Sequence, residues 1–88
     1  MNNQRRKKVT KIIEKISALE SLMSELKEAV EEIRDEEQEC LDNIPENLMG
    51  TERYEATELA VENLESAFCW FESADTEELT GYLEEAMQ

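Results

Sequence analysis

The side chains that most often perform chemistry in proteins are scarce in this chain of 88 residues. There is no histidine, which removes the usual general base near neutral pH and the commonest zinc ligand. Ser-His and Cys-His catalysis are therefore excluded. The two thiols, Cys40 and Cys69, form no CxxC motif, and no glycine-rich loop could cradle a phosphate. We expect a protein that is not an enzyme and that binds no cofactor.

Carboxylates are the one reactive group present in quantity. The densest run consists of Glu31, Glu32, Asp35, Glu36, Glu37, Glu39 and Asp42. A carboxylate metal site in a helical bundle also needs Glu-x-x-His pairs, so without histidine we expect no bound metal. Two interpretations of the run stay open. It is a solvated helix face, or it presents negative charge as a DNA backbone does and occupies the basic groove of a nucleic-acid enzyme.

The formal net charge of −14 is unevenly distributed along the chain. Residues 1–15 hold six basic residues against Glu14 alone, a net charge of +5. The remainder holds three basic residues against 22 acids, a net charge of −19. So acidic a surface repels nucleic acid except at the N-terminal segment, and we expect a basic protein as partner and no direct nucleic-acid binding.

These acids lie on a helix that an apolar seam predicts. An unbroken 3-4 spacing comprises Val9, Ile12, Ile16, Leu19, Met23, Leu26, Val30, Ile33, Glu37, Cys40 and Ile44. A seam this narrow on so long a helix must be covered by another helix. Glu37 is its only charged member, and it is either exposed near the end of the helix or paired with Arg53 or Arg34.

The chain is predicted to be all-α and to form a single domain over residues 1–88. A first helix over about 3–43 ends before Pro45, because proline pushes the preceding residue out of the α region. After a turn over 44–50, Thr51 is the expected N-cap of a helix over about 51–74. A capping box from Asp75 to Glu78 predicts a kink near residue 75 and a short helix over about 76–87.

The second and third helices have apolar faces of their own. The expected seam of the second helix comprises Tyr54, Thr57, Val61, Leu64, Phe68 and Phe71, beside a stripe of small residues, Ala60, Ala67 and Ala74. The short last helix is expected to turn Leu79, Tyr82, Leu83 and Ala86 inward. Helical arms on both sides of a proline-glycine turn predict a long, coiled-coil-like antiparallel hairpin.

Charge and two outlying apolar residues extend this prediction. Folding back lays the basic N-terminal segment beside Glu77, Glu78, Glu84 and Glu85, and exposed pairs worth about 0.2 to 1 kcal/mol each would together select the antiparallel register. Leu59 and Trp70 lie off the seam, eleven residues apart on one outer stripe. They serve dimerisation into a four-helix bundle or binding of a partner protein, and dimerisation is the commoner case.

The sequence also bears on location. It has no stretch of 18 or more apolar residues, and its basic start runs into an amphipathic segment, so we expect neither a membrane span nor a signal peptide. A basic amphipathic start can lie on anionic membranes, but the seam explains the same apolar positions better. We expect a cytosolic protein without membrane contact.

Three motifs carry a resemblance to known proteins. They are Ile33-Arg34-Asp35-Glu36-Glu37-Gln38-Glu39, Asn43-Ile44-Pro45-Glu46-Asn47-Leu48 and Glu52-Arg53-Tyr54-Glu55. Over roughly residues 30–67 the chain resembles a group of small, acidic, helical proteins of phages and other mobile elements in Firmicutes. The resemblance implies a helical hairpin and a setting in the bacterial host cytosol, and it carries no catalytic residue.

Two functional hypotheses follow. The first is a phage-encoded inhibitor that binds a host nucleic-acid-processing or defence protein as DNA-mimicking anti-CRISPR proteins do. The second is a structural or adaptor coiled coil that acts through self-association. The residues expected to bind a partner are Glu32, Asp35, Glu36, Glu39, Asp42, Leu59 and Trp70.

Overall fold

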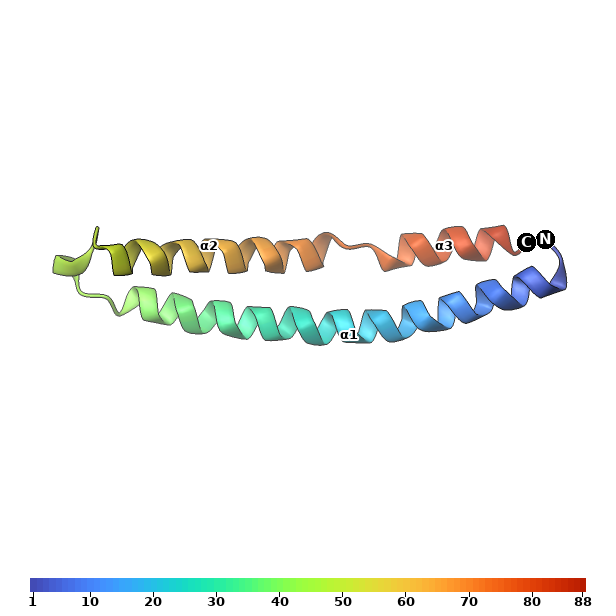
Figure 1. Cartoon of the computed structure of the whole chain (residues 1–88), viewed down its shortest axis with the longest axis horizontal. Coiled ribbons are helices and arrows are strands. Elements are labelled where there is room, and N and C mark those ends of the chain that lie inside the picture. The colour runs from blue at the N-terminus through green and yellow to red at the C-terminus, as the bar shows by residue number, and fades with distance from the viewer. The chain divides into compact units, whose positions relative to one another are not determined.

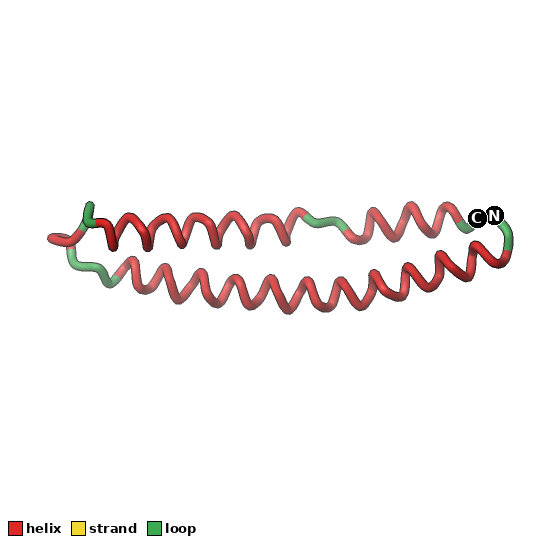
Figure 2. The backbone as a smooth tube through the Cα atoms, viewed as in Figure 1, coloured by secondary structure: helices red, strands yellow, loops and turns green.

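The computed structural model describes all 88 residues, and its regular structure is entirely helical. The elements are α1 (Asn3–Asp42), the 3-10 turn η1 (Glu46–Leu48), α2 (Glu52–Ser73) and α3 (Thr76–Ala86) (Figures 1 and 2). The predicted all-α class is confirmed, and the bounds of the three α-helices lie within one residue of those expected. None of the helices combines the length and the apolar character that crossing a lipid bilayer requires.

The chain divides into two compact units. The terminal unit comprises Met1–Glu25 and Ala74–Gln88, and the central unit comprises Leu26–Ser73. Helix α1 contributes its first part to the terminal unit and its second part to the central unit. A single hairpin over the whole chain, one domain and a dimeric four-helix bundle all stay predictions.

The turn of the central unit is built from proline, glycine and threonine. Pro45 precedes η1 with φ −60°, which ends α1 as the sequence predicts. Gly50 has φ +88°, in the region that favours glycine because it has no Cβ. The Thr51 hydroxyl accepts the Tyr54 N–H at 3.4 Å and donates to the Leu48 carbonyl at 2.7 Å. Thr51 is thus the N-cap of α2, as predicted.

The break near residue 75 is also present. The Asp75 side chain accepts a hydrogen bond from the Glu78 N–H at 2.9 Å and caps α3. This bond satisfies one of the backbone donors that a helix start leaves unpaired. The predicted capping residue and the predicted helix start are therefore both correct.

Within the central unit the second part of α1 and α2 lie side by side and antiparallel (Figure 1). Lys27 pairs with Glu72, and seven residues further along α1, Arg34 pairs with Glu65. The six predicted seam residues of α2 are all half-buried, as are Ala60 and Ala67. The predicted face of α2 is the one that meets α1.

The predicted face of α1 is wrong at five of its eleven positions. Apart from Glu31, the buried and half-buried residues from Val9 to Ile44 are Val9, Ile13, Ile16, Glu20, Met23, Lys27, Val30, Arg34, Glu37, Leu41 and Ile44. Every second predicted position is replaced by its C-terminal neighbour. Ile12, Leu19, Leu26 and Ile33 are instead 46–49% exposed, and Cys40 is exposed too. In the central unit the cause is visible, because this rotation of α1 lets Lys27 and Arg34 reach α2.

The terminal unit holds the one buried side chain of the protein, Ile16, which is 7% exposed. The half-buried residues of α3 and its C-cap follow a 3-4 spacing and are Thr76, Thr80, Leu83 and Met87, together with Gly81. Of the four residues expected to turn inward, only Leu83 does, while Leu79, Tyr82 and Ala86 are exposed. The Tyr82 hydroxyl donates to the Glu78 carboxylate at 2.9 Å, which holds the ring along the surface of α3.

The basic N-terminal segment forms none of the ion pairs expected with the acids of α3. Arg6 donates from Nε to the Met87 backbone carbonyl at 2.9 Å instead. The carbonyl end of a helix carries partial negative charge, so a cation there is stabilised without a carboxylate partner. In the terminal unit a helix end thus takes the place of the expected side-chain pairs.

Candidate interaction surfaces

The acidic residues predicted to bind a partner share one exposed surface of α1. Glu32, Asp35, Glu36, Glu39 and Asp42 are all exposed and all belong to the central unit. Positions 32, 35, 39 and 42 alternate steps of three and four residues, so they line one helix face. We call these five residues the acidic face.

The members of the acidic face differ in what their carboxylates contact. Asp35 pairs with Arg34 at 3.2 Å, and Asp42 accepts a hydrogen bond from the Gln38 amide at 2.9 Å. The carboxylates of Glu32, Glu36 and Glu39 form no ion pair and no hydrogen bond within the chain. These three carboxylates are therefore free to pair with a basic group of another molecule.

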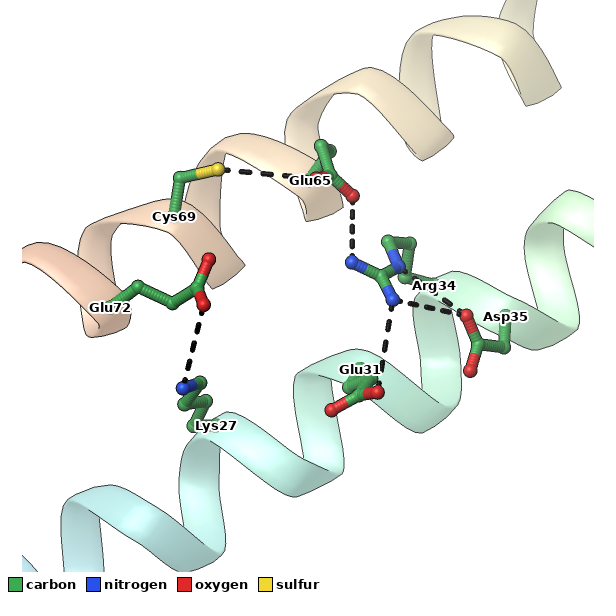
Figure 3. A network of polar contacts seen from close by, with 7 residues as sticks. All are labelled: Lys27, Glu31, Arg34, Asp35, Glu65, Cys69 and Glu72. Carbon is green, nitrogen blue, oxygen red and sulfur yellow. Dashed lines mark hydrogen bonds and ion pairs between the residues drawn. The ribbon is translucent and has the colours of Figure 1, made fainter.

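A polar network joins α1 to α2 in the central unit (Figure 3). Arg34 donates to Glu65 at 2.8 Å and also contacts Asp35 and, at 3.9 Å, Glu31. Lys27 reaches Glu72 at 3.8 Å. The apolar spacing did not predict this network. Its signal is present, because Lys27 and Arg34 on α1 and Glu65 and Glu72 on α2 are each seven residues apart.

Phe68 lies between the two cations of the network. The Lys27 ammonium is 5.1 Å from the ring centroid, and the Arg34 guanidinium carbon is 4.7 Å from it. A cation over an aromatic face is attracted by the ring quadrupole. Charged groups of α1 therefore meet an aromatic ring of the half-buried α2 face, where the sequence predicted an apolar seam on both sides.

The hydrogen bond that Arg34 donates to the Glu65 carboxylate, together with the contacts with Asp35, raises the pKa of Arg34 despite its partial desolvation. The pKa of Arg34 is higher in the folded state than in the unfolded state, so protonated Arg34 stabilises the fold. This contribution to the free energy of unfolding is fully present below the ordinary pKa of arginine. It is lost only as the pH rises through the raised value. Arg34 therefore stays a cation wherever the protein is studied, and this network is no pH switch.

Glu37, the charged residue of the predicted seam, is half-buried and forms no ion pair. Of the two expected partners, Arg34 is engaged by Glu31, Asp35 and Glu65, and Arg53 forms no ion pair. Neither alternative from the sequence describes it fully. It is partly covered at a helix contact and keeps enough contact with water to stay unpaired.

Trp70 and Leu59 are exposed, as predicted for residues off the seam of α2. Their exposed fractions are 63% and 57%. The Trp70 ring meets Phe71 edge-on, with the ring centroids 5.3 Å apart. Apart from this contact, most of the indole is uncovered.

The two sides of the helix pair in the central unit differ in character. On the polar side a hollow is lined by Arg34, Asp35, Gln38, Val61, Glu62, Glu65 and Ser66. Leu26 and Ile33 directly precede Lys27 and Arg34, so they point about 100° away from them, toward the opposite side. On α2, Ala67 lies about 200° around the helix from Glu65 and hence also opposite the network. We call this opposite side the apolar side, formed by Leu26, Ala29, Ile33, Ala60, Ala67 and Trp70.

The remaining candidate groups stay apart. Cys40 and Cys69 are free, exposed thiols. The structure brings no three Cys, Asp or Glu side chains together in an arrangement suited to a metal ion. The notable features are therefore surfaces, and the two best developed are the acidic face and the apolar side.

Comparison with protein-family models, curated proteins and solved structures gave no match for this chain.

Proposed function

We propose that this protein is a non-enzymatic, protein-binding module whose acidic face engages a basic protein in the bacterial cytosol. The partner class is a host nucleic-acid-processing or defence protein, and the module inhibits it as a DNA mimic of the anti-CRISPR type. An origin in a phage or mobile element belongs to the same proposal. The observation that carries it is the set of unpaired carboxylates on one helix face, at Glu32, Glu36 and Glu39.

The charge balance of the two units supports this assignment. The central unit contains three basic residues and 15 acids, a net charge of −12. The terminal unit contains six basic residues and eight acids, a net charge of −2. Long-range attraction of a basic partner would therefore be directed to the central unit, where the acidic face lies.

The spacing of the charges also suits a mimic of nucleic acid. At a rise of about 1.5 Å per residue, the acidic run from Glu31 to Asp42 places roughly one carboxylate every 2 to 3 Å along α1. Duplex DNA carries about one charge per 1.7 Å of its axis, and each strand about one per 3.4 Å. The linear charge density of this segment falls between the two, so a groove that binds DNA could accept it.

Charge reversal tests the proposal directly. The immobilised protein would be exposed to bacterial lysate, and the retained basic proteins would be eluted with duplex DNA. A triple variant, Glu32→Lys, Glu36→Lys and Glu39→Lys, should lose retention that is salt-sensitive and DNA-displaceable in the parent protein. The matched control reverses three acids of α2 at Glu52, Glu55 and Glu58. Unchanged retention by the first variant, or equal loss in both, would contradict a specific role for the acidic face.

A second function, a structural or adaptor coiled coil acting by self-association, is favoured by a different observation. Only Ile16 is buried, whereas twelve large apolar side chains are exposed. A long antiparallel hairpin that pairs into a four-helix bundle would cover many of them. This function predicts that changes on the apolar side matter and that changes on the acidic face are silent.

A further inference from the structure

We propose that the apolar side of the central unit is the docking surface for a second copy of this chain. The proposal deepens the second function above by naming the surface and its occupant. It concerns a surface other than the acidic face, and the two surfaces adjoin at Glu36.

The distribution of charge on α2 is the first support. From Glu52 onward its acids are Glu52, Glu55, Glu58, Glu62, Glu65 and Glu72. Between Ala56 and Trp70, the residues on the side of α2 opposite the network carry no charge: Ala56, Leu59, Ala60, Asn63, Ala67 and Trp70. Glu52, five turns before Trp70 and so in the same direction, lies beyond this stretch at the turn end of α2. A unit with a net charge of −12 can approach an identical unit only where carboxylates do not meet, and this uncharged face meets that condition.

The antiparallel register extends the uncharged surface across both helices. The pairs Lys27–Glu72 and Arg34–Glu65 place Trp70 level with Ala29 on α1. Leu26 and Ile33 flank Ala29 one turn to each side. Glu36 lies further toward the turn, level with Asn63, at the rim of this surface. The apolar side is thus continuous from α1 to α2 around Trp70.

The side chains on this surface also alternate in size. Trp70, Leu26 and Ile33 project, whereas Ala29, Ala60 and Ala67 leave room for a close approach. Projecting residues of one copy can fill the space over the alanines of the other, which is the self-complementarity that a two-fold interface needs. An exposed tryptophan beside small residues is also typical of a binding hot spot.

The amount of exposed surface is the last support. The chain exposes 6876 Å². A compact protein of its mass would expose about 5300 Å², so the excess is on the order of 1500 Å². A stable dimer of ordinary size buries about 800 Å² on each partner. The excess, taken over the whole chain, is large enough for one second copy, and a face without charge offers a basic protein no ion pair.

The test compares variants by sedimentation equilibrium of the full chain. Trp70→Glu and Ile33→Glu each put a charge on the apolar side and should raise the dissociation constant of the dimer about tenfold or more. Ser66→Glu and Gln38→Glu add the same charge at the hollow on the polar side and should leave it nearly unchanged. Circular dichroism would establish that each variant keeps its helix content.

A second measurement needs no variant that might unfold. Trp70 is the only tryptophan, so its fluorescence reports on this surface alone. Its emission should shift to shorter wavelength, and its quenching by acrylamide should fall, as the protein concentration rises through the dissociation constant. The Ile33→Glu variant should show neither change over the same range.

Two results would overturn the proposal. One is a monomer at all accessible concentrations with constant Trp70 emission, which would leave the face to a different molecule. The other is equal dissociation by the apolar-side and polar-side variants. Charge reversal at Glu32 and Glu39 alone, away from the rim at Glu36, tests the inhibitor function separately, so failure here is distinguishable from failure of that function.

Discussion

In the terminal unit α1 meets α3 beside the one buried side chain of the protein, Ile16, whereas the central unit has no buried side chain. There α1 meets α2 through Lys27, Arg34 and the acids that pair with them around Phe68. The units also differ in net charge, −2 against −12. One helix therefore belongs to two environments, and ion pairs between helices are formed in the central unit alone.

The difference explains what each unit leaves exposed. Where long cationic side chains bridge to the neighbouring helix, α1 is turned so that Leu26 and Ile33 face outward. Lys27 and Arg34 take the place of these two residues at the helix contact. Leu26 and Ile33 are therefore available for contact with another molecule. The central unit, with its acidic face and its apolar side, is for this reason the region to which both proposed functions are assigned.

The largest expected effect is loss of the single buried side chain. Ile16→Ala should lower the free energy of unfolding by about 2 to 3 kcal/mol, because it removes buried methyl groups and leaves a cavity. Ile12→Ala, at a half-exposed position of the same helix, should cost roughly 0.5 kcal/mol. Urea denaturation followed by circular dichroism measures both, and equal losses would remove the distinction between the faces of α1.

Replacing glycine by alanine should change the stability in opposite directions in the two units. Gly50→Ala in the central unit should destabilise by about 1 to 2 kcal/mol, since φ is +88° there. Gly81→Ala in α3 should stabilise by about 0.5 to 1 kcal/mol, because a helical position with open space around the added Cβ favours alanine. Thermal melting compares the two variants, and a shift of the same sign in both would contradict the assigned turn geometry.

The polar network should contribute to the central unit alone. Arg34→Met keeps much of the aliphatic stem but removes the contacts with Glu65, Glu31 and Asp35, and it should lower the melting temperature. Arg53→Met removes an arginine without an ion pair from the same unit and should have a smaller effect. If the two variants melt alike, the network is a surface feature without consequence for stability.

Added salt should have the smallest effect on stability, and this effect should differ between the two units. Raising the ionic strength screens the repulsion among the 15 acids of the central unit more than it weakens the few ion pairs. Amide hydrogen exchange in α2 should therefore slow at high salt, while exchange in α3, within a unit of net charge −2, should hardly change. A larger response in α3 than in α2 would contradict this ranking.

Much of the local structure could be predicted from the sequence because it depends on local chemistry. Pro45, Gly50, Thr51 and Asp75 determine helix ends through backbone conformation and short-range hydrogen bonds. The seam of α2 was also predictable, because the apolar face of this helix is the face that contacts α1.

The face of α1 could not be predicted from apolar spacing. Val9, Ile16, Met23 and Val30 fit either of two neighbouring seams, and apolar spacing alone favours the one with Ile12 and Leu19. The choice depends on charged partners that lie far away along the chain, as with Arg34 and Glu65. The candidate site shows the same division, because exposure of the acidic residues and Trp70 was predictable, whereas their arrangement into a polar and an apolar side was not.

The central claim is that exposed apolar surface of the central unit is completed by a second molecule of the same kind. Sedimentation equilibrium of the unmodified protein over a wide concentration range tests it most directly. The predicted result is a mass that rises from the 10.2 kDa of one chain to twice that value and then stays constant. A mass of 10.2 kDa at every concentration would contradict the claim.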